Sequence, residues 1–174
     1  MKKINIGLIG LGVVSQQKHL PAYKTAGFNV VAISDIREEA RIIAYKWGIK
    51  SFFTDYRKLL ELDEVDIVDI ATPPKTHLEI ACAAAEAGKH ILIQKPLATS
   101  FEDAKEIVRI AEKNKVKLAV NQSFRWVPSY ALTKKYLDEG YIGKPFLITA
   151  EERTTANRTG AAEGWRLQME REMI

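Results

Sequence analysis

The sequence predicts a doubly wound α/β fold, in which helices cover both faces of a parallel β-sheet. Short, β-branched apolar segments alternate with longer segments of helical periodicity through residues 1–125. Helices of this length between strands imply parallel neighbours that are joined by right-handed crossovers. Buried parallel strands are apolar along most of their length, and residues 4–9 and 67–71 approximate that pattern.

The expected strands and helices follow one another along the chain. We expect strands at residues 4–9, 28–34, 51–53, 65–71, 90–93 and 116–120. We expect helices at residues 20–26, 37–47, 56–62, 75–87 and 128–139, and one that begins after Ser100. Asp103 follows Ser100 with the spacing of a capping box. The helical period of this segment predicts a buried face made of Phe101, Ala104, Val108 and Ala111.

The chain divides into three parts. We expect residues 1–125 to form the doubly wound domain, residues 126–143 a linker helix and turn, and residues 144–174 the incomplete start of a second, α+β domain. The apolar segment 146–150 predicts a strand. Only eight of the 24 residues 151–174 are hydrophobic, a third, against 47% of the whole chain. About thirty residues are too few to build an independent core.

Composition and charge exclude several classes of protein. With 47% hydrophobic and 28% charged residues among 174, the chain is globular rather than disordered. The net charge of +4 comes from basic residues scattered among acidic ones, so we expect no nucleic-acid partner. No apolar run approaches the ~20 residues that span a bilayer, and we expect no membrane partner and no signal peptide. The single Cys82 favours a reducing, cytoplasmic compartment, and no Cys, His and Asp spacing predicts a metal site.

The first strand runs into a glycine-containing turn at residues 10–15, GLGVVS. Gly10 permits a tight turn there, and Gly12 lets a phosphate group approach the backbone. Val13 and Val14 open the following helix, whose free N–H groups and dipole favour a pyrophosphate. The turn therefore predicts a dinucleotide-binding site.

An acidic residue stands where the ribose of such a nucleotide would lie. Asp35 ends the second strand, 23 residues after Gly12, close to the ~20 that is typical of this motif. Its carboxylate would accept hydrogen bonds from both ribose hydroxyls; the alternative is that Asp35 only caps the next helix. Asp35 would repel a 2′-phosphate and favours NAD, whereas Arg37 would attract that phosphate and favours NADP. Ser15 replaces the third glycine of the motif and is small enough for close packing.

Polar segments also follow the later strands, at residues 71–77, 94–96 and 121–125. Ligands of a doubly wound sheet bind beyond the carboxyl ends of the strands, so these segments should face one crevice. The segments after the last two strands contain Gln94, Lys95 and Gln122, which are candidate cofactor contacts.

Lys95 is the candidate catalytic residue. Hydride transfer at a carbon that bears oxygen needs a proton donor, a proton acceptor or a cation, and a partly buried lysine could fill either role. The alternative is an ordinary solvated loop lysine. His77, in the first turns of a helix, is either a catalytic residue or a structural one on that helix. Cys82 is expected to be a small packing residue.

These segments together resemble the Gfo/Idh/MocA family of oxidoreductases (glucose-fructose oxidoreductase, inositol dehydrogenase and rhizopine catabolism). The matching residues are 9–12 (IGLG), 71–74 (ATPP) with His77, 87–90 (AGKH), 94–98 (QKPLA), 140–143 (GYIG), Arg125, Pro128, Trp165 and Arg166. The resemblance implies a Rossmann domain that is followed by a domain built on an open, mostly antiparallel sheet. It also implies NAD- or NADP-dependent oxidation or reduction of small sugars, polyols or inositols, and a homo-oligomer for the full-length protein.

The resemblance assigns roles to individual residues. It places Lys95 near the nicotinamide ribose and the substrate, with a cis bond between Lys95 and Pro96. It assigns cofactor-lining positions to Thr72, Pro73, His77, Trp165 and Arg166.

Two departures from the family pattern limit these expectations. Gln94 replaces the usual glutamate, so Lys95 lacks an adjacent carboxylate partner. The Asp…His pair that the family uses on the substrate side has no counterpart in the 174 residues. We therefore expect the chain to bind the cofactor without being catalytically complete. The alternative is a non-catalytic NAD(P)-binding or protein-interaction module.

Overall fold

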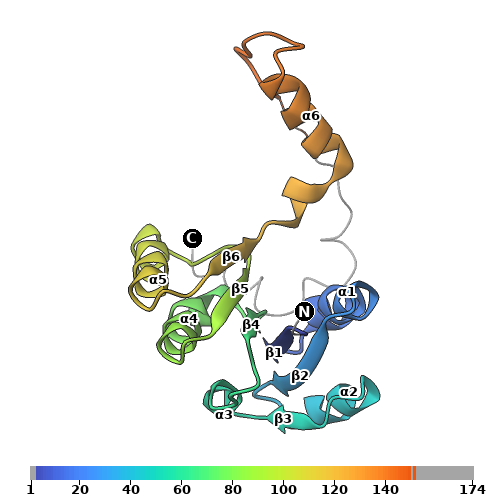
Figure 1. Cartoon of the computed structure of the whole chain (residues 1–174), viewed down its shortest axis with the longest axis vertical. Coiled ribbons are helices and arrows are strands. Elements are labelled where there is room, and N and C mark those ends of the chain that lie inside the picture. The colour runs from blue at the N-terminus through green and yellow to red at the C-terminus, as the bar shows by residue number, and fades with distance from the viewer. Residues whose placement is uncertain (1–2, 150, 152–174) are drawn as a thin grey trace, which may run out of the picture. The chain divides into compact units, whose positions relative to one another are not determined.

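The computed structural model describes residues 3–149 and 151. The chain consists of two compact units, Met1–Gln122 and Ser123–Ile174. Figure 1 shows the ribbon of the chain, with all six strands in the first unit. The linker expected at residues 126–143 and the second domain expected from residue 144 stay predictions.

The first unit is built on a six-stranded parallel sheet in the order β3-β2-β1-β4-β5-β6. The strands are β1 Asn5–Ile9, β2 Asn29–Ser34, β3 Ser51–Phe53, β4 Ile67–Ile70, β5 His90–Gln94 and β6 Leu118–Asn121. The helices are α1 Leu20–Ala26, α2 Ala40–Lys46, α3 Tyr56–Leu60, α4 His77–Glu86 and α5 Phe101–Lys113. The order grows outward from β1 in both directions, which confirms the predicted doubly wound α/β fold.

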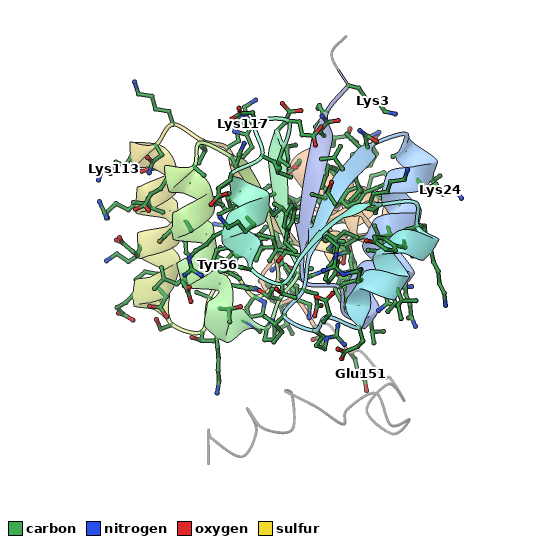
Figure 2. All side chains as sticks on the ribbon, turned by 90° about the horizontal axis from the view of Figure 1, so that it is seen from below. Lys3, Lys24, Tyr56, Lys113, Lys117 and Glu151 are labelled. Carbon is green, nitrogen blue, oxygen red and sulfur yellow. The ribbon has the colours of Figure 1, made fainter. Side chains whose placement is uncertain are left out.

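Side chains that alternate along the strands build two separate core layers. Leu8 and Ile33 point to the face that α1 and α2 cover. Their neighbours Ile9 and Ala32 point to the opposite face, which packs against α3, α4 and α5. Figure 2 shows the strands between these layers, with Lys24 of α1 and Lys113 of α5 on opposite sides.

Helix α5 begins where its capping residue predicts, but its buried face differs from the prediction. The Ser100 hydroxyl accepts a hydrogen bond of 3.1 Å from the Asp103 backbone N–H. Phe101 and Val108 are 72% and 40% exposed. Ala111 is buried as predicted and Ala104 is half-buried, whereas the other buried side chains of α5 are those of Ile107 and Ile110. The helix carries two neighbouring apolar stripes of the same period, and the larger β-branched residues occupy the one that faces the sheet.

Several other predicted boundaries shift by a few residues: β4 and β6 each begin two residues later than expected, and two helices also begin later. Helix α2 begins at Ala40 rather than at residue 37, because residues 37–39 form a turn in which Ala40 N–H donates to the Arg37 carbonyl. The helix expected from residue 75 opens with a 3-10 turn, Pro74–Thr76, and becomes α4 at His77.

The second unit contains a 3-10 turn, Ser123–Trp126, and helix α6, Pro128–Asp138, close to the predicted 128–139. The strand expected at residues 146–150 is a wrong prediction for residues 146–149, which have no regular secondary structure. Phe146, Leu147 and Ile148 are at least 74% exposed. A strand needs a partner strand for its hydrogen bonds, and the described residues offer none beside this segment. Residue 150 lies outside the described residues.

Gly7, in the middle of β1, is required by close packing. A Cβ atom at Gly7 would lie 2.5 Å from Leu59 Cδ2 and 3.1 Å from Val65 Cγ1. Leu59 is fully buried, so it cannot move aside. We expect Gly7→Ala to lower the free energy of unfolding by about 1–3 kcal/mol, measured by urea denaturation. Gly12→Ala is the matched control, because its methyl group meets no atom within 4 Å; equal stability of the two variants would contradict the prediction.

Candidate nucleotide-binding site

The segments predicted to bind a ligand end at one edge of the sheet. Ile9 of β1 pairs with Ser34 of β2 and with Ile70 of β4. Ile70 pairs in turn with Ile93 of β5, and Ile93 with Val120 of β6. The predicted site residues that follow or close these strands, and so share this edge, are Gly10, Gly12, Val13, Val14, Asp35, Arg37, Thr72, Pro73, His77, Gln94, Lys95 and Gln122.

Two glycines in the turn after β1 have different reasons to be glycine. Gly10 has φ +93°, and a Cβ atom there would lie 2.8 Å from the carbonyl oxygen of Ala71. Its N–H donates to the Ser34 carbonyl at 2.7 Å, so the turn is held against both neighbouring strands. Gly12, in contrast, has no atom within 4 Å of its would-be Cβ. Packing therefore requires Gly10, while Gly12 leaves a bare backbone that faces open space.

The helix after this turn presents its N-terminus to the same space. The helical backbone starts at Val13, winds as a π-helix over Ser15–His19 and continues as α1. N–H groups in the first turn of a helix have no intrahelical acceptor and attract anions. Val13 and Val14 are 65% and 42% exposed, so their side chains add nothing to the core. This geometry suits a phosphate group.

Ser15 explains the missing third glycine of the motif. Its side chain is fully buried, and its hydroxyl donates a hydrogen bond of 2.6 Å to the Gly10 carbonyl. The serine thus ties the first turn of the helix to the glycine turn, a contact that a glycine could not make.

The Asp35 carboxylate is buried and holds four hydrogen bonds. Oδ2 accepts from the Leu11 N–H at 2.8 Å and from the Arg37 guanidinium at 2.9 Å. Oδ1 accepts from the backbone N–H and from Nε of Arg37, both at 2.9 Å. Glu39, not Asp35, is the N-cap residue of α2, so the alternative that Asp35 caps the next helix is wrong.

Charge and exposure at this pair follow from the same contacts. Burial by itself would raise the pKa of the Asp35 carboxyl. The hydrogen bonds from the Arg37 side chain and from the backbone N–H groups of Arg37 and Leu11 outweigh burial and hold that pKa below its usual range. The Arg37 side chain is half exposed, so it can leave the carboxylate without crossing packed protein.

Ile36, between these two residues, escaped the sequence interpretation. Its side chain is 89% exposed. No other large hydrophobic residue described in the first unit is as exposed. Its signal was present in the sequence, because a bulky β-branched residue that follows a strand end has no core to enter. An exposed apolar side chain beside the carboxylate that is predicted to meet the ribose is suited to contact a nucleotide base.

His77 joins the loops after β4 and β5. The side chain is fully buried, with Nε2 3.0 Å from the Thr72 carbonyl and Nδ1 3.0 Å from the Pro96 carbonyl. The Lys95–Pro96 bond is cis, as the resemblance implies. His77 therefore shapes the site through the loops that it holds. Pro73 is exposed at the same edge, and the Thr72 hydroxyl accepts from the Thr76 hydroxyl at 2.8 Å.

The residues after β5 and β6 differ from expectation. Lys95 is exposed rather than partly buried, because it follows the last paired residue of β5 and its side chain leaves the sheet edge. The Gln94 side chain turns inward, with Nε2 3.0 Å from His19 Nε2. Gln122 is exposed. Trp165 and Arg166 lie outside the described residues.

A buried polar cluster beneath this edge was missed by the sequence interpretation. Asp69 of β4 is fully buried, and its Oδ2 lies 2.6 Å from His19 Nδ1 and 2.7 Å from the Tyr23 hydroxyl. Burial, together with the neighbouring Asp69, raises the pKa of Tyr23 well above its usual range. The available signal was an aspartate inside an apolar strand, together with His19 and Tyr23 four residues apart on one helix.

Within residues 3–149 and 151, no helix combines the length and apolar character needed to cross a membrane. The same residues contain no group of three or more His, Cys, Asp or Glu side chains placed to hold a metal ion.

A family model described as an oxidoreductase family with an NAD-binding Rossmann fold (GFO_IDH_MocA) matches residues 4–122. This chain belongs to the Gfo/Idh/MocA family. The match covers the whole of the sheet described above, so the first unit is the NAD-binding Rossmann domain of a family of NAD(P)-dependent oxidoreductases.

Relatives and solved structures of the Gfo/Idh/MocA family share this domain. Levoglucosan dehydrogenase of Pseudarthrobacter phenanthrenivorans is 36% identical over 154 residues, which cover 83% of this chain and 39% of that protein. A structure of levoglucosan dehydrogenase in complex with NADH and levoglucosan has 35% identity and a TM-score of 0.74, covering 82% of this chain and 41% of the other. A 3-ketoreductase from Actinomadura kijaniata, in complex with TDP-benzene and NADP, has 32% identity and a TM-score of 0.73, covering 82% and 46%. The chain thus spans less than half the length of these relatives.

Proposed function

We propose that this chain is the nucleotide-binding part of an NAD(P)-dependent oxidoreductase that acts by hydride transfer on a sugar, polyol or inositol-like substrate. The observation that carries the proposal is the glycine turn, where Gly12 leaves its backbone open beside a helix N-terminus. The Leu11 N–H fixes the Asp35 carboxylate at 2.8 Å from the same turn. Pyrophosphate and ribose need these two features side by side.

The proposed cofactor is NAD, with NADP as the alternative. Asp35 would accept hydrogen bonds from the ribose hydroxyls after the Arg37 side chain has moved away from it. Arg37 would in turn bind a 2′-phosphate if NADP enters. Among the homologous structures, one holds NADH and another NADP, so both choices exist among relatives. Ile36 would cover one face of the adenine.

At the other end of the site, Lys95 is the proposed catalytic residue. A bound nicotinamide supplies or accepts the hydride in this family, while a substrate hydroxyl loses or gains a proton. The exposed Lys95 would hold that proton or stabilise the developing charge on oxygen. Thr72, Pro73, His77, Gln94, Gln122, Trp165 and Arg166 are proposed to line or shape the cofactor site around it.

The substrate and the assembly are proposals drawn from relatives. Levoglucosan dehydrogenase, by its name, acts on a sugar derivative, which favours a small sugar-like substrate for this chain. The family's substrate-side Asp…His pair has no counterpart in these 174 residues. We therefore propose that turnover needs further residues, and that the full-length protein forms a homo-oligomer.

The proposal predicts nucleotide binding without turnover by the 174-residue chain. A calorimetric titration of the chain with NADH should give a Kd between roughly one and several hundred micromolar, and ADP-ribose should compete with NADH for the site. Mixtures of the chain with NAD⁺ and either levoglucosan or myo-inositol should produce no NADH absorbance at 340 nm, a wavelength set by the dihydronicotinamide. Absence of NADH and NADPH binding would favour an interaction module instead. Production of NADH would show that the 174 residues are catalytically sufficient.

A further inference from the structure

The buried cluster around Asp69 reaches the backbone of Lys95 through two intermediate side chains. Asp69 Oδ2 lies 2.6 Å from His19 Nδ1, and His19 Nε2 lies 3.0 Å from Gln94 Nε2. Gln94 Oε1 then accepts a hydrogen bond of 2.8 Å from the Lys95 N–H. Asn121 Nδ2 approaches the same His19 Nε2 at 3.3 Å. Asp69 and His19 are at most 5% exposed, so water does not compete for the contact between these two side chains.

The donors and acceptors in this series of hydrogen bonds can be assigned from one group, the Lys95 backbone N–H, which can only donate. A backbone N–H can only donate, so the atom of Gln94 that faces the Lys95 N–H must be the amide oxygen. The Gln94 NH₂ group therefore points at His19 and donates to Nε2. A nitrogen that accepts carries no proton, which leaves the imidazole proton of a neutral His19 on Nδ1, where Asp69 accepts it.

The fold places these side chains together by simple alternation. Val68 and Ile70 of β4 pack on the α4 face of the sheet, as do Ile91 and Ile93 of β5. Asp69 and Gln94 therefore point to the opposite face, where the first helix lies. The π-helical turn Ser15–His19 brings His19 onto that face, with the Leu20 N–H bonded to the Ser15 carbonyl. Such turns are frequent at functional sites.

The hydrogen bonds of the Asp69 carboxylate join it to two side chains of the first helix, His19 and Tyr23. Its Oδ2 takes both the His19 and the Tyr23 hydrogen bonds, while Oδ1 has no hydrogen-bond partner there. A fully buried carboxylate is costly to keep, and a core position of this kind is usually apolar. A carboxylate at this position has a function that an apolar residue could not fill, because it fixes the imidazole proton of His19 on Nδ1.

We propose that His19 is a positioning residue for Lys95. Asp69 holds the imidazole proton on Nδ1, the bare Nε2 orients the Gln94 amide, and the amide oxygen holds the Lys95 backbone beside the cis bond to Pro96. This inference rests on the proposed function, because that function places Lys95 beside the nicotinamide ribose.

The network also accounts for glutamine at position 94. The Gln94 amide offers a donor to His19 and an acceptor to Lys95 at the same time, which a carboxylate cannot do. Gln94→Glu would set an acceptor against the bare Nε2 of His19. The variant can satisfy this contact only with an added proton, placed on Nε2 of His19 or on the new carboxyl group.

The first test reads the protons directly. Long-range ¹H–¹⁵N correlation of the imidazole rings, assigned with His19 variants, should show Nδ1 protonated and Nε2 bare in the wild-type chain. The same spectrum of Gln94→Glu should show a shifted Nε2 signal of His19, because the contact with the new carboxyl group needs an added proton. A proton on Nε2 of His19 in the wild type would overturn the proposal.

The second test separates positioning from general stability. An asparagine at position 19 keeps a donor near Nδ1 but has no atom at Nε2, whereas a glutamine places an amide oxygen near Nε2 that can accept from Gln94. His19→Asn should raise the Kd of NADH about tenfold and leave that of ADP-ribose within about twofold, because ADP-ribose lacks the nicotinamide end. His19→Gln should restore the wild-type ratio of the two Kd values.

The outcomes distinguish this inference from the proposed function. Equal weakening of NADH and ADP-ribose by His19→Asn, or no change in either, would overturn the positioning role while nucleotide binding stands. If the wild-type chain bound neither ligand, the proposed function would fall, and the positioning role would fall with it.

Discussion

Replacing Gly10 by alanine is expected to cost the chain about 3 kcal/mol or more of unfolding free energy and its nucleotide binding. The positive φ of +93° disfavours any side chain by roughly 1–2 kcal/mol. The added Cβ would also lie 2.8 Å from the Ala71 carbonyl oxygen and 3.1 Å from Thr72 Cγ2. The Ala71 backbone, whose N–H donates to the Ile9 carbonyl of β1 at 2.8 Å, cannot shift freely, so the turn itself must move, at a further cost of about 1–3 kcal/mol.

Gly12→Ala provides the matched comparison in the same turn. Its methyl group meets no protein atom within 4 Å, so stability should stay within about 1 kcal/mol of wild type. The methyl group would occupy the space proposed for the pyrophosphate, so NADH binding should weaken at least about tenfold. Urea denaturation and NADH titration of both variants check the prediction. Wild-type NADH affinity in Gly12→Ala would contradict the proposal that the pyrophosphate binds at this turn.

Replacing Asp35 by alanine is expected to reverse the preference of the site. Loss of the carboxylate removes the two proposed ribose contacts, worth about 3 kcal/mol together, so NAD affinity should fall roughly 100-fold. Arg37, now without its partner, becomes available to a 2′-phosphate, so NADP affinity should fall far less. Leaving the buried Leu11 N–H unpaired should also lower stability by about 1–3 kcal/mol.

Arg37→Ala is the companion variant and should act in the opposite direction. It removes the guanidinium contact from each oxygen of Asp35 and leaves the backbone N–H contacts in place, so NAD binding should be retained or improved, while NADP binding weakens. Calorimetric Kd values for both cofactors in the wild type and the two variants give the ratios. If Asp35→Ala bound NAD as tightly as the wild type, Asp35 would not be the residue that binds the ribose.

The parts of the fold that the sequence predicts well are those set by local chemistry. Gly10, Gly12 and Asp35 lie within one strand–turn–helix–strand segment, and each has a backbone or charge requirement that its residue type reveals. The strands around them are apolar and the helices are periodic, so the order of elements follows directly. The family resemblance also predicts the cis peptide bond between Lys95 and Pro96, which the structure contains.

The parts that escaped depend on contacts between distant segments. His19 is 50 residues from Asp69 and 75 residues from Gln94 along the chain, and only the strand order brings them together. The exposure of Lys95 depends on where β5 stops pairing, which its sequence does not mark. Helix α5 has two apolar stripes of equal period, and only the sheet decides which of them, that of Ile107 or that of Phe101, is buried.

The ring of His77 has a mechanical consequence for the site. One fully buried side chain lies 3.0 Å from the Thr72 carbonyl oxygen on one loop and 3.0 Å from the Pro96 carbonyl oxygen on the next. A neutral imidazole donates to one of these carbonyls and packs against the other, so a shift of either loop is felt by the ring that contacts both. A ligand that orders either loop also orders the other, and the loss of conformational entropy is incurred once rather than twice. Contacts made at the Thr72 loop thereby preset the segment that carries Lys95, before any substrate arrives.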